Sequence, residues 1–133
     1  MRHFRTFMLI AALLPLVAAC GGSRLSKAEQ ADLSKLPEKA LAERALAYFN
    51  NTDYRTAIEV YGLILAREKP DRKYAAWARY EIGFCYYYLD EFDRSKIEFE
   101  RVLKDYPQEE FAGQRKLATL LLEKIRTGRT ESI

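Results

Sequence analysis

Two stretches of the sequence carry the same pattern at a spacing of 38 residues, and this internal repeat constrains the fold more than any other feature. The segment 45–65 aligns without a gap with the segment 83–103. In both copies an apolar helical period gives way to a short polar turn, at 50–53 and at 90–91, and then resumes. Each copy is therefore expected to form a helix-turn-helix hairpin.

The spacing within each copy resembles the tetratricopeptide repeat, whose pattern is W-x2-L-G-x2-Y, then A-x3-F, then P. The second copy places Gly83, Tyr86, Ser95, Phe99 and Pro107 at the spacing of that pattern. The first copy carries the matching residues Ala45, Tyr48, Ala57, Tyr61 and Pro70. The resemblance covers roughly residues 38–125 and implies that the small residues let the two helices of each hairpin approach closely.

Both prolines are followed by an aromatic residue and an alanine, in Tyr74-Ala75 and in Phe111-Ala112. This signature is similar to the periplasmic subgroup that includes the lipoprotein of the β-barrel assembly machinery and the Tol-Pal-associated cell-division coordinator. Two positions depart from the family pattern, because Arg44 and Arg79 replace large apolar residues. We therefore expect the start of each first helix to be less buried than usual. The period exceeds the usual 34 residues by about one turn, so the first helix of the second copy should begin near Asp71.

The expected fold is all-α, a short tetratricopeptide-like α-solenoid of two helical hairpins and a C-terminal capping helix. The hairpins should pair 37–50 with 54–69 and 72–89 with 92–105, and the final helix should span 108–127. Leu117, Leu120, Leu121 and Ile125 form the apolar stripe of that final helix. Two alignments of this final helix with the first helix of the second copy are possible, so its register stays open. Alignment by the prolines puts Leu117 on Tyr80, whereas alignment by small residues puts Ala118 on Gly83. The tail should be frayed from Arg129 onward.

The N-terminal segment has the layout of a secretory signal peptide, with Arg2, His3 and Arg5 before an apolar run. Residues 6–20 are too short a run for a comfortable membrane span, which needs about 20 residues. Val17-Ala18-Ala19-Cys20 resembles the lipobox of bacterial lipoproteins, and this resemblance implies that the Cys20 thiol is acylated. Gly21 follows the cysteine where Asp often marks inner-membrane retention, which favours the outer membrane.

These features divide the chain into a lipoprotein signal peptide at 1–19, a lipidated linker and weak helix at 20–36, a repeat domain at 37–127 and a tail at 128–133. Ser26-x-x-Glu29 has the spacing of a capping box and should begin the weak helix. Two or three acyl chains suffice for stable anchoring, so the mature protein should sit on a membrane without spanning it.

Loss of residues 1–19 leaves 114 residues with 20 Lys and Arg against 19 Asp and Glu, and it removes His3, the only histidine. A nearly neutral chain gives no argument for nucleic-acid binding. A chain without histidine excludes Ser-His and Cys-His pairs, so we expect no enzyme, no metal and no cofactor. Cys85 should be an inert core thiol, and the acidic cluster at 90–93 lacks the spacing of a calcium loop.

In tetratricopeptide arrays the first helix of each repeat lines a concave groove, so the resemblance implies a partner-binding site here. In the second copy the groove positions hold five aromatic residues, Trp77, Tyr80, Phe84, Tyr87 and Tyr88. In the first copy they hold Lys39, Ala42, Leu46, Phe49 and Asn50, of which Leu46 and Phe49 complete the candidate site. Aromatic side chains are favoured at recognition surfaces. The alternative is that the stripe is core, covered by the C-terminal helix or by residues 25–36, and the groove interpretation is strongest for Trp77, Tyr80 and Tyr87.

The expected function is a membrane-anchored adaptor that binds a segment of a partner protein in assembly or maintenance of the cell envelope, on the periplasmic face of the outer membrane. One alternative is a pilotin-like assembly factor for a secretion or pilus component. Another is a self-associating structural subunit, which light scattering would distinguish from a monomer.

The basic stretch 67–73 is either an exposed loop between repeats or a contact for anionic lipid. An envelope hydrolase is disfavoured, because the chain has no Gly-rich nucleophile turn.

Overall fold

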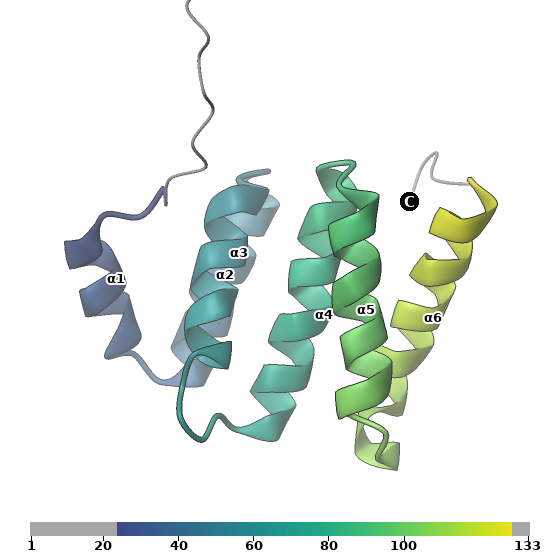
Figure 1. The fold of residues 1–133 in the computed structure, drawn as a ribbon. Coiled ribbons are helices and arrows are strands. Elements are labelled where there is room, and N and C mark those ends of the chain that lie inside the picture. Colours follow the sequence, from purple (N-terminus) through teal and green to yellow (C-terminus); the bar gives the residue numbers. More distant parts are fainter. Residues whose placement is uncertain (1–23, 129–133) are drawn as a thin grey trace, which may run out of the picture.

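The computed structural model describes residues 24–128, and within them every regular element is a helix. These elements are α1 (Lys27–Ser34), α2 (Glu38–Asn50), α3 (Tyr54–Leu65), α4 (Arg72–Tyr88), α5 (Phe92–Asp105), a 3-10 turn η1 (Glu109–Phe111) and α6 (Ala112–Thr127). The helices stand side by side in a row, with α2–α3 and α4–α5 as hairpins (Figure 1). The expected short helical solenoid is confirmed. Across the described part of the chain, no helix combines the length and apolar character that a membrane span requires.

Side chains cap the helices where the sequence predicts it. The Ser26 and Glu29 side chains form the expected capping box at the start of α1. Asp71 accepts hydrogen bonds from the backbone N–H of Lys73 at 2.8 Å and of Tyr74 at 3.4 Å, so α4 begins one turn early, as predicted. The hairpin turns are also repeated, because Thr52 and Asp90 stand 38 residues apart and both adopt left-handed φ angles, of 60° and 57°.

Two helix boundaries differ from the prediction. Helix α3 ends at Leu65 rather than at residue 69, and the chain runs as a loop to Pro70. The Arg67 side chain in this loop turns back to donate to the carbonyl oxygens of Leu36 and of Ser34, the latter at 3.4 Å. The loop therefore braces the connection between α1 and α2 instead of extending α3. The second difference is that the final helical segment begins as the 3-10 turn η1.

The close approach of α4 and α5 at Gly83 is confirmed. The Ser95 hydroxyl donates to the Gly83 carbonyl oxygen at 2.8 Å, and a Cβ added at Gly83 would lie 2.8 Å from Cε1 of Phe99. Ala45 and Ala57 hold the same places in the first hairpin and are both fully buried. Small residues at these positions therefore bring the helix backbones together, as the repeat pattern requires.

Gly83→Leu is expected to destabilise the domain by about 1 to 3 kcal/mol, because overpacking forces the Phe99 ring and the two backbones apart. The matched pair Gly83→Ala and Gly62→Ala isolates this contact, since a Cβ at Gly62 meets nothing within 4 Å. Gly62→Ala should stabilise its helix by about 0.5 to 1 kcal/mol, whereas Gly83→Ala should not. Thermal melts measure both, and equal effects of the two alanines would contradict the assigned contact.

Arg44 and Arg79, which replace apolar residues of the repeat pattern, differ in their exposure. Arg44 is exposed, as expected for a less buried helix start. Arg79 is not exposed, because its guanidinium pairs with the Glu98 carboxylate at 2.9 Å and its side chain is only 19% exposed. The prediction was wrong there, since an ion pair with α5 allows the cation to lie between the helices.

Helix α6 packs on α5 through only part of the predicted stripe, since Leu121 and Ile125 are confirmed as packing residues and Leu117 and Leu120 are not. Ala118 and Leu121 are buried and Ile125 packs beside them, whereas Leu117 and Leu120 are 40% and 55% exposed. In the preceding repeat, Ile82 and Cys85 of α4 pack on α3. Ala118 and Leu121 of α6 stand 36 residues after them and pack on α5 in the same way. This register lies between the two alignments that the sequence left open. A 3-10 turn has fewer residues per turn than an α-helix, so η1 changes the register of the helix that follows it.

Candidate partner-binding surface

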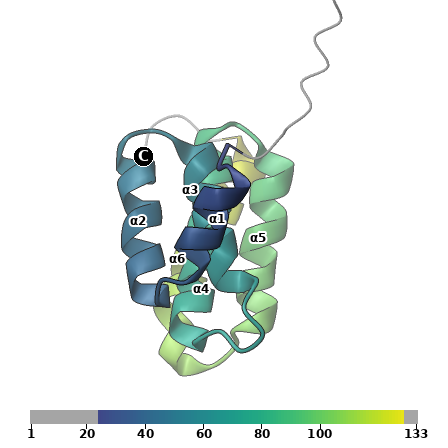
Figure 2. The same ribbon diagram turned by 90° about the vertical axis from the view of Figure 1, so that its left-hand side faces the viewer.

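The candidate surface is one side of the row of helices. Helices α2, α4 and α6 form one layer, and α3 and α5 form the other. Figure 2 looks along the row and shows α2 on one side and α5 on the opposite side. We refer to the open side of the first layer as the α2–α4–α6 face. It corresponds to the groove that the sequence pattern predicts.

The predicted aromatic residues come together along α4 and meet the first hairpin. Trp77 contacts Tyr80 at 5.6 Å between ring centroids, and Tyr80 contacts Phe84 at 5.9 Å. Phe84 then stacks on Phe49 of α2 at 5.6 Å and meets Tyr88 at 4.9 Å. The aromatic stripe is therefore one continuous set of ring contacts that joins the two hairpins.

Tyr80 and Tyr87 do not line an open groove. They are only 6% and 5% exposed, and they belong to a core cluster with Phe99 of α5 and Leu121 of α6. The Tyr80 ring lies 5.8 Å from that of Phe99. The groove prediction is wrong for these two residues, because their rings point into the space between α4, α5 and α6, which is the alternative that the sequence left open.

The remaining residues of the prediction are open to different degrees. Trp77, Tyr88 and Leu46 are 38%, 39% and 45% exposed, whereas Phe49 and Phe84 are half-buried by their mutual stacking. Sequence reasoning missed Leu120 as a surface residue, although it stands 36 residues after Phe84 and is 55% exposed. Only the correct register of α6 could have placed it on the α2–α4–α6 face.

A cavity of about 330 Å³ opens beside Trp77, where the first turns of the three helices converge. Its lining is Lys39, Ala42 and Glu43 from α2, Lys73, Tyr74 and Trp77 from α4, and Gln114 from α6. Lys39, Ala42 and Trp77 are predicted groove positions, whereas Glu43, Lys73, Tyr74 and Gln114 were not predicted as site residues. The lining combines an aromatic wall with two ammonium groups and the Glu43 carboxylate, and we call this hollow the Trp77 cavity.

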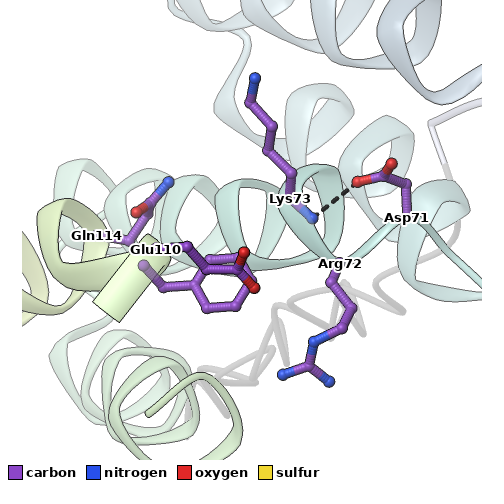
Figure 3. A pocket seen from close by; sticks show the side chains of 6 residues that line it. Asp71, Arg72, Lys73, Glu110 and Gln114 are labelled. Carbon is purple, nitrogen blue, oxygen red and sulfur yellow. Dashed lines mark hydrogen bonds between the residues drawn. The ribbon is translucent and has the colours of Figure 1, made fainter. Parts of the chain in front are cut away.

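A neighbouring hollow of about 390 Å³ lies at the junction of α4 and η1 (Figure 3). Asp71 and Arg72, which line it, already have structural partners. Asp71 caps α4, and Arg72 donates to the Asp105 carbonyl oxygen at 3.3 Å and to Gln108 Oε1 at 3.0 Å. Lys73 and Gln114 line both hollows, and the Lys73 side chain extends away from that of Arg72. Among the residues that line this second hollow, Asp71 therefore caps α4, and Arg72 joins α4 to the end of α5 and to the segment before η1.

The titratable groups of the core offer no reactive site. Burial raises the pKa of the Cys85 thiol to about 12, so the thiol stays protonated at neutral pH, and the prediction of a buried core cysteine is confirmed. Burial also raises the pKa of Glu81, a residue that the sequence did not single out, to about 7.

In the acidic turn, Glu91 pairs with Arg94 at 3.0 Å and Asp93 with Lys96 at 2.9 Å. Within residues 24–128 no group of three His, Cys, Asp or Glu side chains could hold a metal ion. Cys20 lies outside the described residues.

Comparison with known proteins identifies the repeat. Residues 77–109 match the family model described as Tetratricopeptide repeat. No curated protein and no solved structure gave a significant match to the chain. The matched residues include most of α4, all of α5 and the start of η1. Proteins with this repeat generally serve as non-enzymatic scaffolds that bind other proteins. The chain therefore contains a tetratricopeptide repeat, formed by its second hairpin and the turn that follows it.

Proposed function

We propose that this protein is a membrane-anchored adaptor that holds a segment of a partner protein in the bacterial cell envelope. The observation that carries the proposal is the exposure of Trp77, at 38%, beside a cavity on the α2–α4–α6 face. Large exposed aromatic groups are enriched at the centres of protein interfaces, where they contribute much of the binding energy. A tetratricopeptide repeat around them supports protein binding rather than catalysis.

The anchor in this proposal is Cys20, in the lipobox-like sequence that ends at that residue. Acylation there would hold the domain close to a bilayer, and Gly21 favours the periplasmic face of the outer membrane. The role of the protein would then be to keep its partner at that membrane for envelope assembly or maintenance.

Cys20→Ser is expected to release the protein into the soluble periplasm or to leave it unprocessed, because serine offers no thiol for the acyl chains. Fractionation of cells and intact-mass measurement of the purified protein test this expectation. A cleaved wild-type chain whose N-terminal Cys20 has an unmodified mass would remove the anchor from the proposal.

Trp77→Ala is expected to weaken capture of the partner by about 30-fold, since removal of a hot-spot aromatic residue costs about 2 kcal/mol of binding. The measurement is crosslinking of the tagged full chain in native envelopes, followed by quantification of the coprecipitated protein. Ile97→Ala is the matched control, because Ile97 is 47% exposed but lies on α5, away from the proposed surface. Equal capture by both variants would contradict the assignment of the surface.

A further inference from the structure

The α2–α4–α6 face carries lysines that the domain does not neutralise. Lys73 lines the Trp77 cavity, and Lys116 and Lys124 stand four residues before and after the exposed Leu120 on α6. Residues four apart share one face of a helix, so both lysines flank Leu120. Within residues 24–128 none of these three lysines forms an ion pair. Lys39 also lines the cavity and pairs with Glu43 at 4.0 Å.

The opposite layer has a different charge pattern. On α5 four acidic residues match four basic ones, and two of these form ion pairs, Lys96 with Asp93 at 2.9 Å and Arg101 with Glu98 at 2.8 Å. The near-neutral domain is therefore asymmetric, because α2, α4 and α6 together carry nine Lys and Arg against four Glu, whereas α3 and α5 carry five basic and five acidic residues. The positive excess lies in the layer that also exposes Trp77 and Leu120.

The Trp77 cavity has the size for one bulky side chain. Its volume of about 330 Å³ is at the lower end of the range of ligand pockets, and Ala42 leaves room at its wall where a larger residue would fill it. Trp77 and Tyr74 supply aromatic surface for an apolar group, while Lys73 at the rim favours a carboxylate next to that group.

We propose that the α2–α4–α6 face binds an acidic segment of the partner protein, with one bulky apolar side chain in the Trp77 cavity and flanking carboxylates against Lys73 and the lysines of α6. This inference rests on the proposed adaptor function and specifies the chemistry of its partner. Opposite charges would speed the encounter and fix the register of the segment, and the apolar side chain would supply the affinity.

Three synthetic peptides test the chemistry with the full chain in dodecyl maltoside micelles. They are acetyl-GSDEFEDSG-amide, the basic acetyl-GSKKFKKSG-amide, and acetyl-GSDEAEDSG-amide, which lacks the aromatic residue. Trp77 is the only tryptophan of the chain, so its emission reports binding at the cavity directly. The acidic phenylalanine peptide should bind at least about tenfold more tightly than either of the others. Its affinity should fall as NaCl rises from about 50 to about 500 mM, because salt screens exposed charges.

A second experiment reverses the charge of two lysines on the protein and measures binding of the same peptides. Lys73→Glu combined with Lys124→Glu should weaken binding of the acidic phenylalanine peptide by about tenfold or more and should favour the basic one. Lys104→Glu is the matched control, because Lys104 is an exposed lysine of α5, and it should leave the preference unchanged. Circular dichroism melts verify that each variant folds.

Preference for the basic peptide, equal binding of the three peptides, or no saturable change with any of them would overturn the proposal. The adaptor function would survive such a result if envelope crosslinking still captured a partner that Trp77→Ala loses. Conversely, if no partner were captured while the acidic peptide bound selectively, the chemistry of the surface would stand and the adaptor role would fail.

Discussion

Tyr87→Ala is expected to lower the free energy of unfolding by about 3 to 5 kcal/mol, because truncation of a buried aromatic ring leaves a cavity. Tyr87 is 5% exposed, and its ring meets Phe92 at 5.6 Å and Phe84 at 6.4 Å. Small domains have a total stability of about 5 to 15 kcal/mol, so the variant should melt far below the wild type or fail to fold. Urea unfolding followed by far-ultraviolet circular dichroism measures the loss.

Tyr88→Ala is the matched control, since it truncates the same side chain at the next position of α4. Tyr88 is 39% exposed, and its ring contacts those of Phe49, Tyr54 and Phe84, so its truncation should cost less than that of Tyr87, about 1 to 2 kcal/mol. If the two alanine variants lost the same stability, the burial of Tyr87 between α4 and α6 would be wrong, and the open-groove interpretation of this residue would return.

The hairpins could be predicted from the sequence because their determinants are local. Gly83, Ser95 and Phe99 lie within 17 consecutive residues, and their small–small–large pattern specifies one helix contact. Asp71 likewise begins α4 through hydrogen bonds to the N–H groups of its own first turn. Such determinants operate within one helical turn or one hairpin, which is the range that capping patterns and hydrophobic periodicity describe.

The division of the aromatic stripe into core and surface could not be predicted in the same way. Trp77, Tyr80 and Tyr87 are all large aromatic residues on one side of α4, and the periodicity of α4 treats them alike. Burial of the two tyrosines depends on where α5 and α6 lie, and the register of α6 follows a 3-10 turn that no repeat spacing indicated. The same shift exposes Leu117 and Leu120.

The Trp77 cavity could be predicted only in part, because the repeat positions place Lys39, Ala42 and Trp77 on the groove but not its other lining residues. Lys39, Lys73 and Gln114 belong to three different helices and meet only because the first turns of those helices converge. A repeat pattern locates the groove as a set of helix positions, but residues that precede the aligned core, such as Lys73 and Tyr74, fall outside that set. Their role depends on the extra turn at the start of α4.

Glu81 gives the second large expected effect, a loss of stability as the pH rises. Its side chain is 6% exposed on α4, and burial raises its pKa from 4.5 to about 7. Its charge also contributes to the raised pKa values of Tyr61, Tyr80 and Cys85, so these groups lie near its carboxyl. No pattern in the sequence indicates this burial, because an acidic residue inside a helix is usually solvated.

The direction of the pH effect follows from proton binding. Between about pH 4.5 and 7 the folded protein keeps a proton on Glu81 that the unfolded chain has lost, so the free energy of unfolding falls as the pH rises through this window. The total loss is about 3 kcal/mol, since each pKa unit corresponds to about 1.4 kcal/mol. Urea unfolding at a series of pH values measures the slope.

Glu81→Gln should remove most of this slope and make the domain more stable than the wild type at pH values above the raised pKa, because the amide has no charge to bury. At lower pH the two proteins should be close in stability, since the wild-type carboxyl is then protonated in the folded state. Glu43→Gln on α2 is the control, because the Glu43 side chain is 68% exposed and its removal should leave the slope unchanged. A slope that persists in Glu81→Gln would assign the pH dependence to other groups, and it would mean that folding does not raise the pKa of Glu81.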